Sequence, residues 1–162
     1  MESIYLDTSA FVKRFSRERA SDIVDMLFTA CQVGKVKIII SSWVINKGIA
    51  VIDRKFRRRE ISLEERNMGI STLLEQTDSL ATTGSLAIIP VTQDNVDGSL
   101  EFVMKHHLSA EDALHLFSAV ISSCKIFVAA DRVLVEVANV DLHGFNIEKS
   151  PDQRSLSRLL NL

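Results

Sequence analysis

Three aspartates stand at positions where a carboxylate can take part in chemistry. Asp7 follows the short apolar run at residues 4–6, and Asp131 follows a second apolar run. Asp112 stands in the first turn of a predicted helix. In an open α/β sheet, the carboxyl ends of the strands border a common crevice where ligands bind. Three carboxylates gathered there repel one another unless a cation intervenes, so the pattern indicates a divalent metal site and phosphate chemistry.

Each aspartate also has a purely structural interpretation. Short polar side chains accept hydrogen bonds from the free N–H groups in the first turn of a helix. Asp7 or a neighbouring hydroxyl could cap the first helix, and Asp131 could cap the helix that follows it. Ser109 and Asp112 have the spacing of a capping box. Three independent caps need not share one end of a sheet, however, whereas Asp7 and Asp131 both follow the carboxyl ends of predicted strands.

Strands and helices are predicted to alternate along the chain. Runs of β-branched and apolar residues predict the strands, and apolar residues at helical spacing predict the helices. This alternation implies parallel strands with right-handed crossovers, hence a three-layer α/β/α sandwich around a central, mostly parallel sheet. The predicted strands are 4–6, 36–41, 87–91, 125–130 and 144–147. A first helix is predicted from Ser9 onward, and further helices are predicted over 20–33, 43–59, 62–83, 93–106, 110–123, 133–139 and 155–160.

Length and composition predict an ordinary globular protein. The chain has 162 residues, of which 46% are hydrophobic and 25% charged, enough for one domain with a proper core. We expect that domain to span residues 1–150 and to be followed by a tail, 151–162, with one short helix after Pro151. The proline within 87–91 indicates a strand at or ending at a sheet edge. Because the net charge is -2, nucleic-acid binding would depend on a local basic patch.

Other features favour a cytoplasmic location. No apolar stretch approaches the ~18 to 20 residues of a membrane span. The amino-terminal residues have the character of a strand and not of a signal peptide. The cysteines, Cys31 and Cys124, lack metal-type spacing and lie in apolar segments, which is typical of buried free thiols in a reducing compartment.

Three segments of the chain resemble motifs of one known family. Residues 6–13, Leu-Asp-Thr-Ser-Ala-Phe-Val-Lys, are very similar to the opening of PIN domains of the VapC toxin type. Residues 109–116 resemble the third acidic motif of these domains, and residues 128–134 resemble the fourth. The order, the spacing and the ending at 144–147 agree too, so the resemblance covers about residues 1–150.

The resemblance implies a nuclease that uses Mg²⁺ or Mn²⁺ and usually cuts RNA. Asp7, Asp112 and Asp131 would hold the metal, directly or through water, and Ser9 would be a supporting hydroxyl near Asp7. Oxygen ligands suit these hard cations, and the metal would activate a water and stabilise charge on the phosphate. His115, one turn beyond Asp112 on the same helical face, is either a packed, hydrogen-bonded residue or a neighbour of the site.

The resemblance also implies partners. The chain would be the toxin of a toxin–antitoxin pair, with RNA as substrate and a small antitoxin that inserts a segment into the active-site groove. Relatives of this type suggest a homodimer. Two alternatives stay open: a degenerate, non-catalytic PIN domain that binds RNA or protein, and a different metal-dependent phosphohydrolase on an α/β fold.

One position departs from the family's pattern. The family places a glutamate in the helix after the second strand, and the aligned position holds Lys47; a slip of one residue gives Asn46. Two unit charges about 4 Å apart interact by roughly 4 kcal/mol at an effective dielectric near 20, enough to weaken metal binding. Lys47 could turn away and leave a weaker three-carboxylate metal site, take the place of the metal, or contact phosphate. Glu18, Glu111 and Glu136 are alternative ligands, and the sequence favours none of them.

The helix that carries Lys47 is strongly basic toward its end. Lys47, Arg54 and Arg58 are spaced i, i+7 and i+11, which places them on one helical face. If Lys47 faces the pocket, the two arginines extend that face as a track for an RNA backbone. The alternative is a solvated helix end whose cations complement the helix dipole.

Overall fold

Five parallel strands form the centre of the fold. A computed structural model describes residues 2–161 and gives one sheet with the strand order β3-β2-β1-β4-β5. Each neighbouring pair in this sheet is parallel, which confirms the predicted α/β class. The strands are β1 (Glu2–Leu6), β2 (Val36–Ser41), β3 (Leu86–Ile89), β4 (Ile126–Ala129) and β5 (His143–Asn146).

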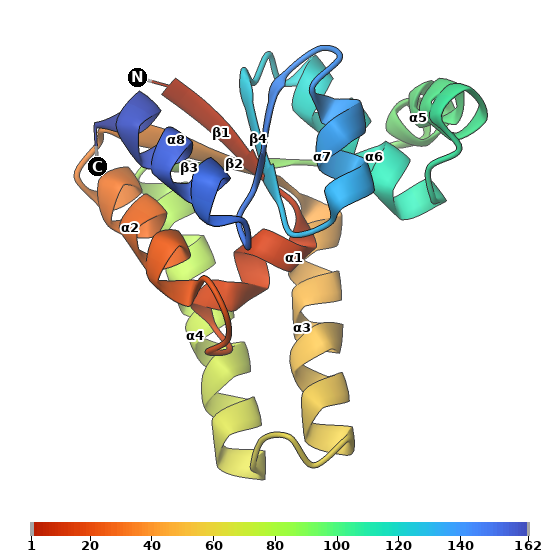
Figure 1. The fold of residues 1–162 in the computed structure, drawn as a ribbon. Helices are drawn as coiled ribbons and strands as arrows, with labels where there is room; N and C mark the ends of the chain where they lie inside the picture. The colour runs from red at the N-terminus through yellow and green to blue at the C-terminus, as the bar shows by residue number, and fades with distance from the viewer. Residues whose placement is uncertain (1, 162) are drawn as a thin grey trace.

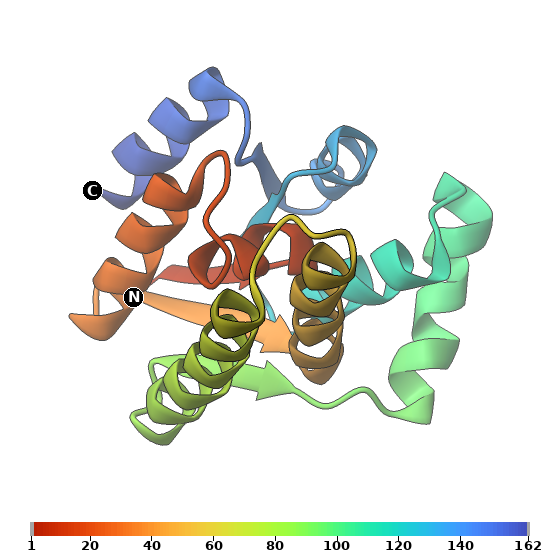
Figure 2. The same cartoon turned by 90° about the horizontal axis from the view of Figure 1, so that it is seen from below.

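Helices cover both faces of this sheet (Figures 1 and 2), which confirms the predicted three-layer sandwich. One face carries α1–α4 and α8, and the other carries α5–α7. The helices are α1 (Thr8–Phe11), followed by the 3-10 turn η1 (Val12–Arg14), α2 (Ser21–Gln32), α3 (Ser42–Arg57), α4 (Leu63–Thr82), α5 (Gln93–His106), α6 (Ala110–Ile121), α7 (Arg132–Ala138) and α8 (Ser150–Leu160).

The core follows from the alternation of side chains along each strand. Successive residues of a strand point to opposite faces of the sheet. In β1, Ile4 and Leu6 therefore pack in the core beneath α1–α4 and α8, whereas Tyr5 packs in the second core beneath α5–α7. β4 divides in the same way, with Val128 in the first core and Phe127 in the second. Both faces of the sheet are buried, which explains why these strands read as continuous apolar runs.

The strand order reverses beside β1, and this reversal creates the crevice. The chain runs outward from β1 through β2 to β3, then crosses back so that β4 and β5 lie on the other side of β1. In open α/β sheets, ligands bind outside the carboxyl ends of the strands at such a switch point. Here the two strands at the switch point are β1 and β4, and they are followed directly by Asp7 and by the loop that carries Asp131.

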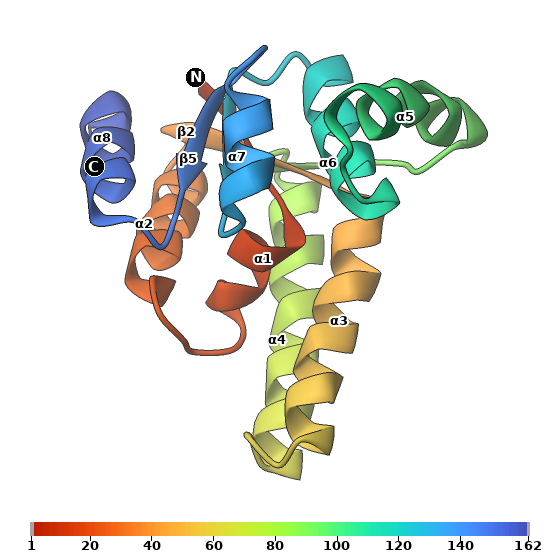
Figure 3. The ribbon, with the colours of Figure 1, turned by 45° about the vertical axis from the view of Figure 1, so that its right-hand side comes forward.

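Helices α3 and α4 form a hairpin that extends past the sheet (Figures 1 and 3). α3 begins immediately after β2, so its first turns lie at the carboxyl edge of the sheet and its last turns project away. A capping box of Ser62 and Glu65 opens α4: Ser62 Oγ accepts a hydrogen bond from the Glu65 backbone N–H, and the Glu65 carboxylate accepts one from Ser62 N.

The two prolines mark element ends in different ways. β3 is an edge strand that stops just before Pro90, as its sequence predicted. The tail helix was predicted at 155–160, but α8 begins at Ser150, and Pro151 lies in its first turn. A proline there costs little because the N–H that it lacks would have no partner within the helix. α8 lies beside α2 in all three views (Figures 1, 2 and 3).

Leu156 and Leu160 of α8 are buried in the first core, so the helix is part of the packed domain surface. Of the predicted segments, 1–150 and 151–162, the first begins at residue 1 and the second ends at residue 162, and these two residues lie outside the described range. Among the helices of residues 2–161, none combines the length and the apolar character that crossing a bilayer requires.

Close packing between β5 and α7 makes Gly144 a sensitive position. A Cβ at Gly144 would lie 2.6 Å from the main-chain oxygen of Val135, which cannot move without distorting α7. We expect Gly144→Ala to lower the free energy of unfolding by about 1–3 kcal/mol, as overpacking typically does.

A Cβ at Gly48 would meet only the end of the Leu73 side chain, at 3.1 Å. Gly48→Ala, the control, should stay within about 1 kcal/mol because the helix propensity of alanine offsets the contact. Urea denaturation followed by circular dichroism measures both, and equal stability of the two variants would contradict the packing argument.

Candidate active site

The switch point brings Asp7 and the loop of Asp131 to one edge of the sheet. Asp7 follows β1 and its main-chain N–H donates to Val128 O of β4, at 3.1 Å. Asp131 follows β4 at the N-cap of α7. Asp112 is the third residue of α6, which covers the second face of the sheet.

Asp7 is almost completely buried, with 5% of its surface exposed. Its Oδ1 atom accepts hydrogen bonds from Ala10 N at 2.8 Å and from Ser9 Oγ at 2.7 Å. Burial raises the pKa of the Asp7 carboxyl because the charged form loses its hydration, and the charge of His115 and these hydrogen bonds oppose the rise. Within residues 2–161 Asp7 forms no ion pair with a lysine or arginine. This carboxylate is therefore held in place but poorly compensated.

Ser9 connects the two sides of the switch point. Its hydroxyl donates to the Asp7 carboxylate, and its oxygen accepts a hydrogen bond from Ala130 N at 2.8 Å. Ala130 is the residue before Asp131, so Ser9 fixes the loop after β4 against the start of α1. The geometry of one aspartate thus depends on the loop that carries the other.

Asp112 and Asp131 take part in helix caps, as the structural interpretation of the sequence allowed. Asp131 Oδ1 accepts a hydrogen bond from Leu134 N at 2.8 Å. Ser109 Oγ donates to Asp112 Oδ2 at 2.8 Å and accepts a hydrogen bond from Asp112 N at 3.1 Å. Asp7 likewise is the N-cap of α1. Capping and ligand binding are compatible, because each carboxylate has a second oxygen and further lone pairs.

His115 is fixed in the interior beside the site. It is 1% exposed, and its two ring nitrogens lie 3.1 Å from Tyr5 Oη (Nδ1) and 3.2 Å from Thr8 Oγ1 (Nε2). Burial raises the pKa of the Tyr5 phenol, so Tyr5 keeps its proton. His115 Nε2 also lies 3.9 Å from Glu111 Oε1, one turn earlier on α6. His115 is therefore both a packed residue and a neighbour of the acidic residues of α6.

Lys47 forms an ion pair across the site. Its Nζ atom lies 2.6 Å from Glu111 Oε2, which joins the second turn of α3 to the first turn of α6. His115 and the Lys47 ammonium hold the pKa of Glu111 at about 2, although partial burial opposes the shift. Glu111 precedes Asp112 in the chain, so a cationic side chain occupies the region between α3 and the predicted ligands on α6.

The rest of the predicted basic track lies farther out on α3. Arg54 and Arg58 are exposed, and Arg58 is the C-cap residue of the helix. At a rise of about 1.5 Å per residue, Arg58 lies about 16 Å along the helix axis from Lys47. Neither arginine forms an ion pair with another described residue. The two guanidinium groups are available to a phosphate, but Lys47 is already paired.

The donor chemistry of the site fits a hard divalent cation. Carboxylate oxygens are the ligands that Mg²⁺ prefers in proteins, and the buried, uncompensated carboxylate of Asp7 would be stabilised by such a charge. The ligands are not assembled in advance, however. Within the described part of the chain, no three His, Cys, Asp or Glu side chains lie close enough together to hold one metal ion. A cation shared by Asp7, Asp112 and Asp131 therefore requires side-chain movement.

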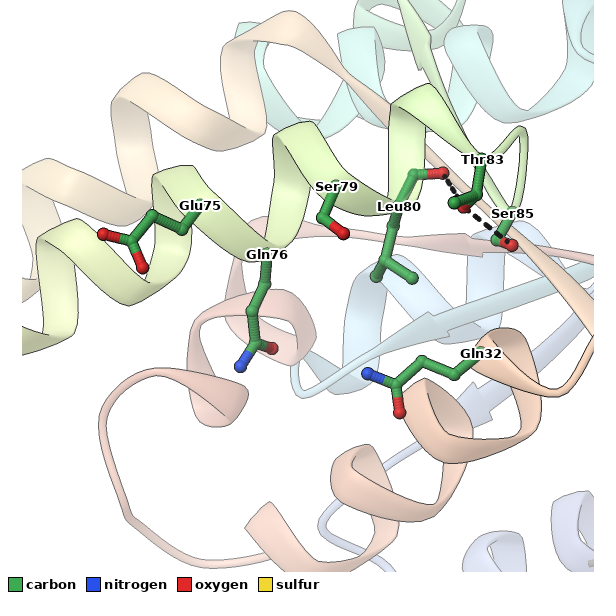
Figure 4. A pocket seen from close by; sticks show the side chains of 7 residues that line it. All are labelled: Gln32, Glu75, Gln76, Ser79, Leu80, Thr83 and Ser85. Atoms are coloured by element: carbon green, nitrogen blue, oxygen red, sulfur yellow. Dashed lines mark hydrogen bonds between the residues drawn. The ribbon is translucent and has the colours of Figure 1, made fainter.

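A separate hollow lies at the opposite edge of the sheet, between α2 and α4 (Figure 4). Its volume is about 410 Å³, and it is bordered by Gln32 at the end of α2, by residues of α4 and by Ser85 just before β3. Glu75 is its one ionisable lining residue, and Thr83 Oγ1 lies 3.1 Å from Leu80 O and 3.2 Å from Ser85 Oγ. This hollow holds none of the predicted site residues.

Comparisons with known proteins identify the family. The family model of the PIN domain matches residues 4–140, so the chain belongs to the PIN domain family. The family predicted from the three motifs is thereby confirmed. A search among curated proteins gave no match.

Two solved structures share the fold at low sequence identity. PAE2754 from Pyrobaculum aerophilum is 16% identical, with a TM-score of 0.60 over 83% of this chain and 78% of that chain. VapC20 from Mycobacterium tuberculosis, a toxin that cleaves the sarcin-ricin loop, is 13% identical, with a TM-score of 0.62 over 86% of this chain and 97% of that chain. At these identities the likeness extends to the fold alone.

Two neighbours of the site were not predicted from the sequence. Thr8 was considered only as a cap, but its hydroxyl contacts His115. Glu111 was considered only as a substitute ligand, but it pairs with Lys47. A signal for the second contact was present, because Glu111 and Lys47 have opposite charges and belong to helices that both begin near the predicted crevice.

The pKa of Glu111 predicts a pH-dependent contribution to stability. Since its folded pKa, about 2, lies below its ordinary value of 4.5, the ionised form stabilises the fold. That stability is fully present above about pH 4.5 and is lost as the pH falls toward about 2. We expect Glu111→Gln to cost about 1 kcal/mol at pH 7, a figure limited by solvent screening of this partly exposed pair. The loss should shrink below pH 4.5.

Urea midpoints measured from pH 2.5 to pH 7 test this expectation on the metal-free protein. Glu136→Gln is a matched control, because Glu136 pairs with Arg132 at 3.6 Å but both side chains are exposed. Its effect should be small at every pH. A pH-independent loss in Glu111→Gln would show that packing, and not charge, is responsible.

Proposed function

We propose that the chain is a divalent-metal-dependent endoribonuclease of the VapC type that hydrolyses phosphodiester bonds of RNA. The observation that carries the proposal is the environment of Asp7. A buried carboxylate with a raised pKa lies at the switch point, forms no ion pair with a lysine or arginine of the described residues, and is tied through Ser9 to the loop of Asp131. Burying such a charged group lowers the stability of the fold, and groups of this kind are typical of functional sites.

Each predicted site residue has a distinct part in this proposal. Asp7, Asp112 and Asp131 would hold Mg²⁺ or Mn²⁺, and Ser9 positions Asp7 by its hydrogen bond. His115 positions the start of α1 through Thr8. When bound, the cation would supply a water of lowered pKa and stabilise negative charge on the phosphate. The protein itself orients the carboxylates and keeps Asp7 out of bulk water.

The substrate and partners follow from the same proposal. Arg54 and Arg58 would contact the RNA backbone along α3, joined by Lys47 if its pair with Glu111 opens. A toxin of this type would act on cytoplasmic RNA, be restrained by a cognate antitoxin and form a homodimer. The domain organisation proposed with it is a nuclease domain over residues 1–150 and a carboxyl-terminal tail over 151–162.

One observation favours a second candidate function, a degenerate PIN domain that binds RNA or protein without cutting. The Lys47 ammonium lies 2.6 Å from the carboxylate of Glu111, the residue that precedes Asp112 in the chain. An internal cation there competes with a metal and neutralises part of the acidic charge. In this alternative, Lys47 and Glu111 maintain the shape of the site and the chemistry is lost.

Asp7→Asn tests the first candidate. Asparagine is also a good N-cap residue, so α1 should be retained. We expect cleavage of single-stranded RNA in Mn²⁺ to fall at least about a hundredfold, because the metal loses an anionic ligand. Because burial raises the pKa of Asp7, the ionised form costs stability; this cost is full above the raised pKa and disappears as the pH falls through it to the ordinary value of 3.8. In EDTA at pH 7, Asp7→Asn should therefore be at least as stable as the parent protein.

The exposed carboxylate of Asp141, which follows α7, provides the control variant Asp141→Asn. It should cut RNA like the parent protein. Cleavage by Asp7→Asn at the parent rate would reject Asp7 as a catalytic residue.

Lys47→Glu distinguishes the two candidate functions. The substitution exchanges a competing cation for a carboxylate, so we expect Mn²⁺ affinity, measured by calorimetry, to rise at least about tenfold. Lys47→Met removes the cation without adding a ligand and is the matched control. Metal binding and RNA cleavage by the parent protein support the nuclease, whereas binding and cleavage by Lys47→Glu alone support the degenerate domain.

A further inference from the structure

A polar hollow of about 430 Å³ lies beside Asp131, at the carboxyl ends of β4 and β5. Arg19, from the loop before α2, lines it together with Arg132, the first residue of α7, and Lys149, the N-cap of α8. Three cations from three separate segments therefore border one cavity in a chain whose net charge is -2. None of them belongs to the basic track predicted on α3.

The charge of this hollow is not cancelled by its acidic lining residue. Glu148 lies 2.7 Å from Lys13 Nζ, and Lys13 is 4% exposed, so the carboxylate is committed to a buried lysine. Arg19 Nη2 donates to the main-chain oxygen of Glu148 at 2.8 Å, which holds the guanidinium at the hollow without neutralising it. Arg132 lies 3.6 Å from Glu136, but that pair is exposed and worth little. Among the residues that line the hollow, three cations thus stand against one carboxylate, and that carboxylate pairs with a buried lysine.

The wall of the hollow is rigid. Asn146, which is buried, donates its side-chain N–H to Ala130 O at 2.9 Å and accepts a hydrogen bond from Glu148 N at 2.9 Å. These bonds join the loop after β4 to the loop after β5. The helix α8 begins at the same place, and Asp152 of its first turn accepts a hydrogen bond from Asn146 N at 2.8 Å.

The hollow adjoins the candidate active site through the residues next to Asp131. Ala130 and Arg132, the residues on either side of Asp131, both line it. Ala130 N is also the group that binds Ser9, the hydrogen-bond partner of Asp7. A phosphodiester at the Asp7–Asp131 edge and a phosphate in the hollow can therefore belong to neighbouring positions of one strand.

We propose that this hollow is a phosphate subsite for single-stranded RNA, in which Arg19, Arg132 and Lys149 bind the backbone phosphate next to the one at the catalytic aspartates. The proposal rests on the proposed function, because the choice of RNA as the ligand comes from it. Binding at the hollow, however, requires neither a metal nor cleavage. A positively charged groove that follows the backbone is the usual means of binding a single strand without reading its sequence.

The test is fluorescence anisotropy of a labelled single-stranded RNA in EDTA, over a range of salt concentrations. The test variant is the double change Arg19→Ala with Lys149→Ala, which leaves Arg132 beside Asp131 intact. The matched control is Lys35→Ala with Lys125→Ala, which removes two exposed lysines just before β2 and β4, at the opposite edge of the sheet. Both doubles change the net charge by the same amount.

The test double should bind RNA about tenfold more weakly. The slope of the logarithm of the binding constant against the logarithm of salt concentration should become shallower by up to about 0.7, because each phosphate contact on a single strand contributes about 0.7. The control double should bind like the parent protein. Arg19→Lys with Lys149→Arg keeps both charges and should bind nearly as well as the parent, which excludes a folding defect at these positions. Equal binding by the test and control doubles overturns the subsite.

Cleavage in Mn²⁺, measured in parallel, separates this proposal from the nuclease proposal. If the parent protein cuts RNA and the test double binds and cuts equally well, the subsite alone fails. If the parent binds RNA through the hollow but does not cut, the nuclease proposal fails and the subsite stands. If the parent neither binds nor cuts, both proposals fail.

Discussion

The burial of one carboxylate, that of Asp7, is the constraint on which the rest of the site depends. The carboxylate lies where β1 ends between two other strands, so little solvent reaches it, and no lysine or arginine among residues 2–161 pairs with it. The hydrogen bonds from Ser9 and Ala10 hold it in place, and the bond from Ala130 N to Ser9 extends that restraint to the loop of Asp131. Without the parallel pairing of β1 and β4, the two aspartates would have no common edge.

The compensating charge could come from outside the chain or from within it. A divalent cation would supply it from outside, and the oxygen donors suit that role. Within the chain, His115 and the hydrogen bonds to Asp7 oppose the rise in the Asp7 pKa, whereas Lys47 is paired with Glu111. Lys47 therefore does not neutralise Asp7. It neutralises Glu111, on the α6 side of the site. This separation explains how a domain with Lys47 at this position could keep affinity for a metal through Asp7.

The sequence predicted the fold well because its signals are local. β-branched runs predicted the strands, the spacing of Ser109 and Asp112 predicted a helix start, and the alternation of strands and helices predicted the parallel sheet. The start of α8 was predicted too late because Pro151 was interpreted as a break. The contacts of Lys47 and the hollow at Lys149 could not be predicted, since they depend on side-chain directions and on loops that meet only in the folded chain.

Two basic regions lie on different sides of β1. α3 carries Arg54 and Arg58 on the β2 side of β1, and the hollow carries Arg19, Arg132 and Lys149 on the β4–β5 side. In the proposed arrangement, an RNA strand that contacts both regions would lie across the side of the sheet on which Asp7 is placed. Backbone contacts of this kind position a strand but do not read its bases. Any preference for sequence must then arise elsewhere, and the thin supply of aromatic side chains, 6% of the chain, makes base stacking a minor contributor.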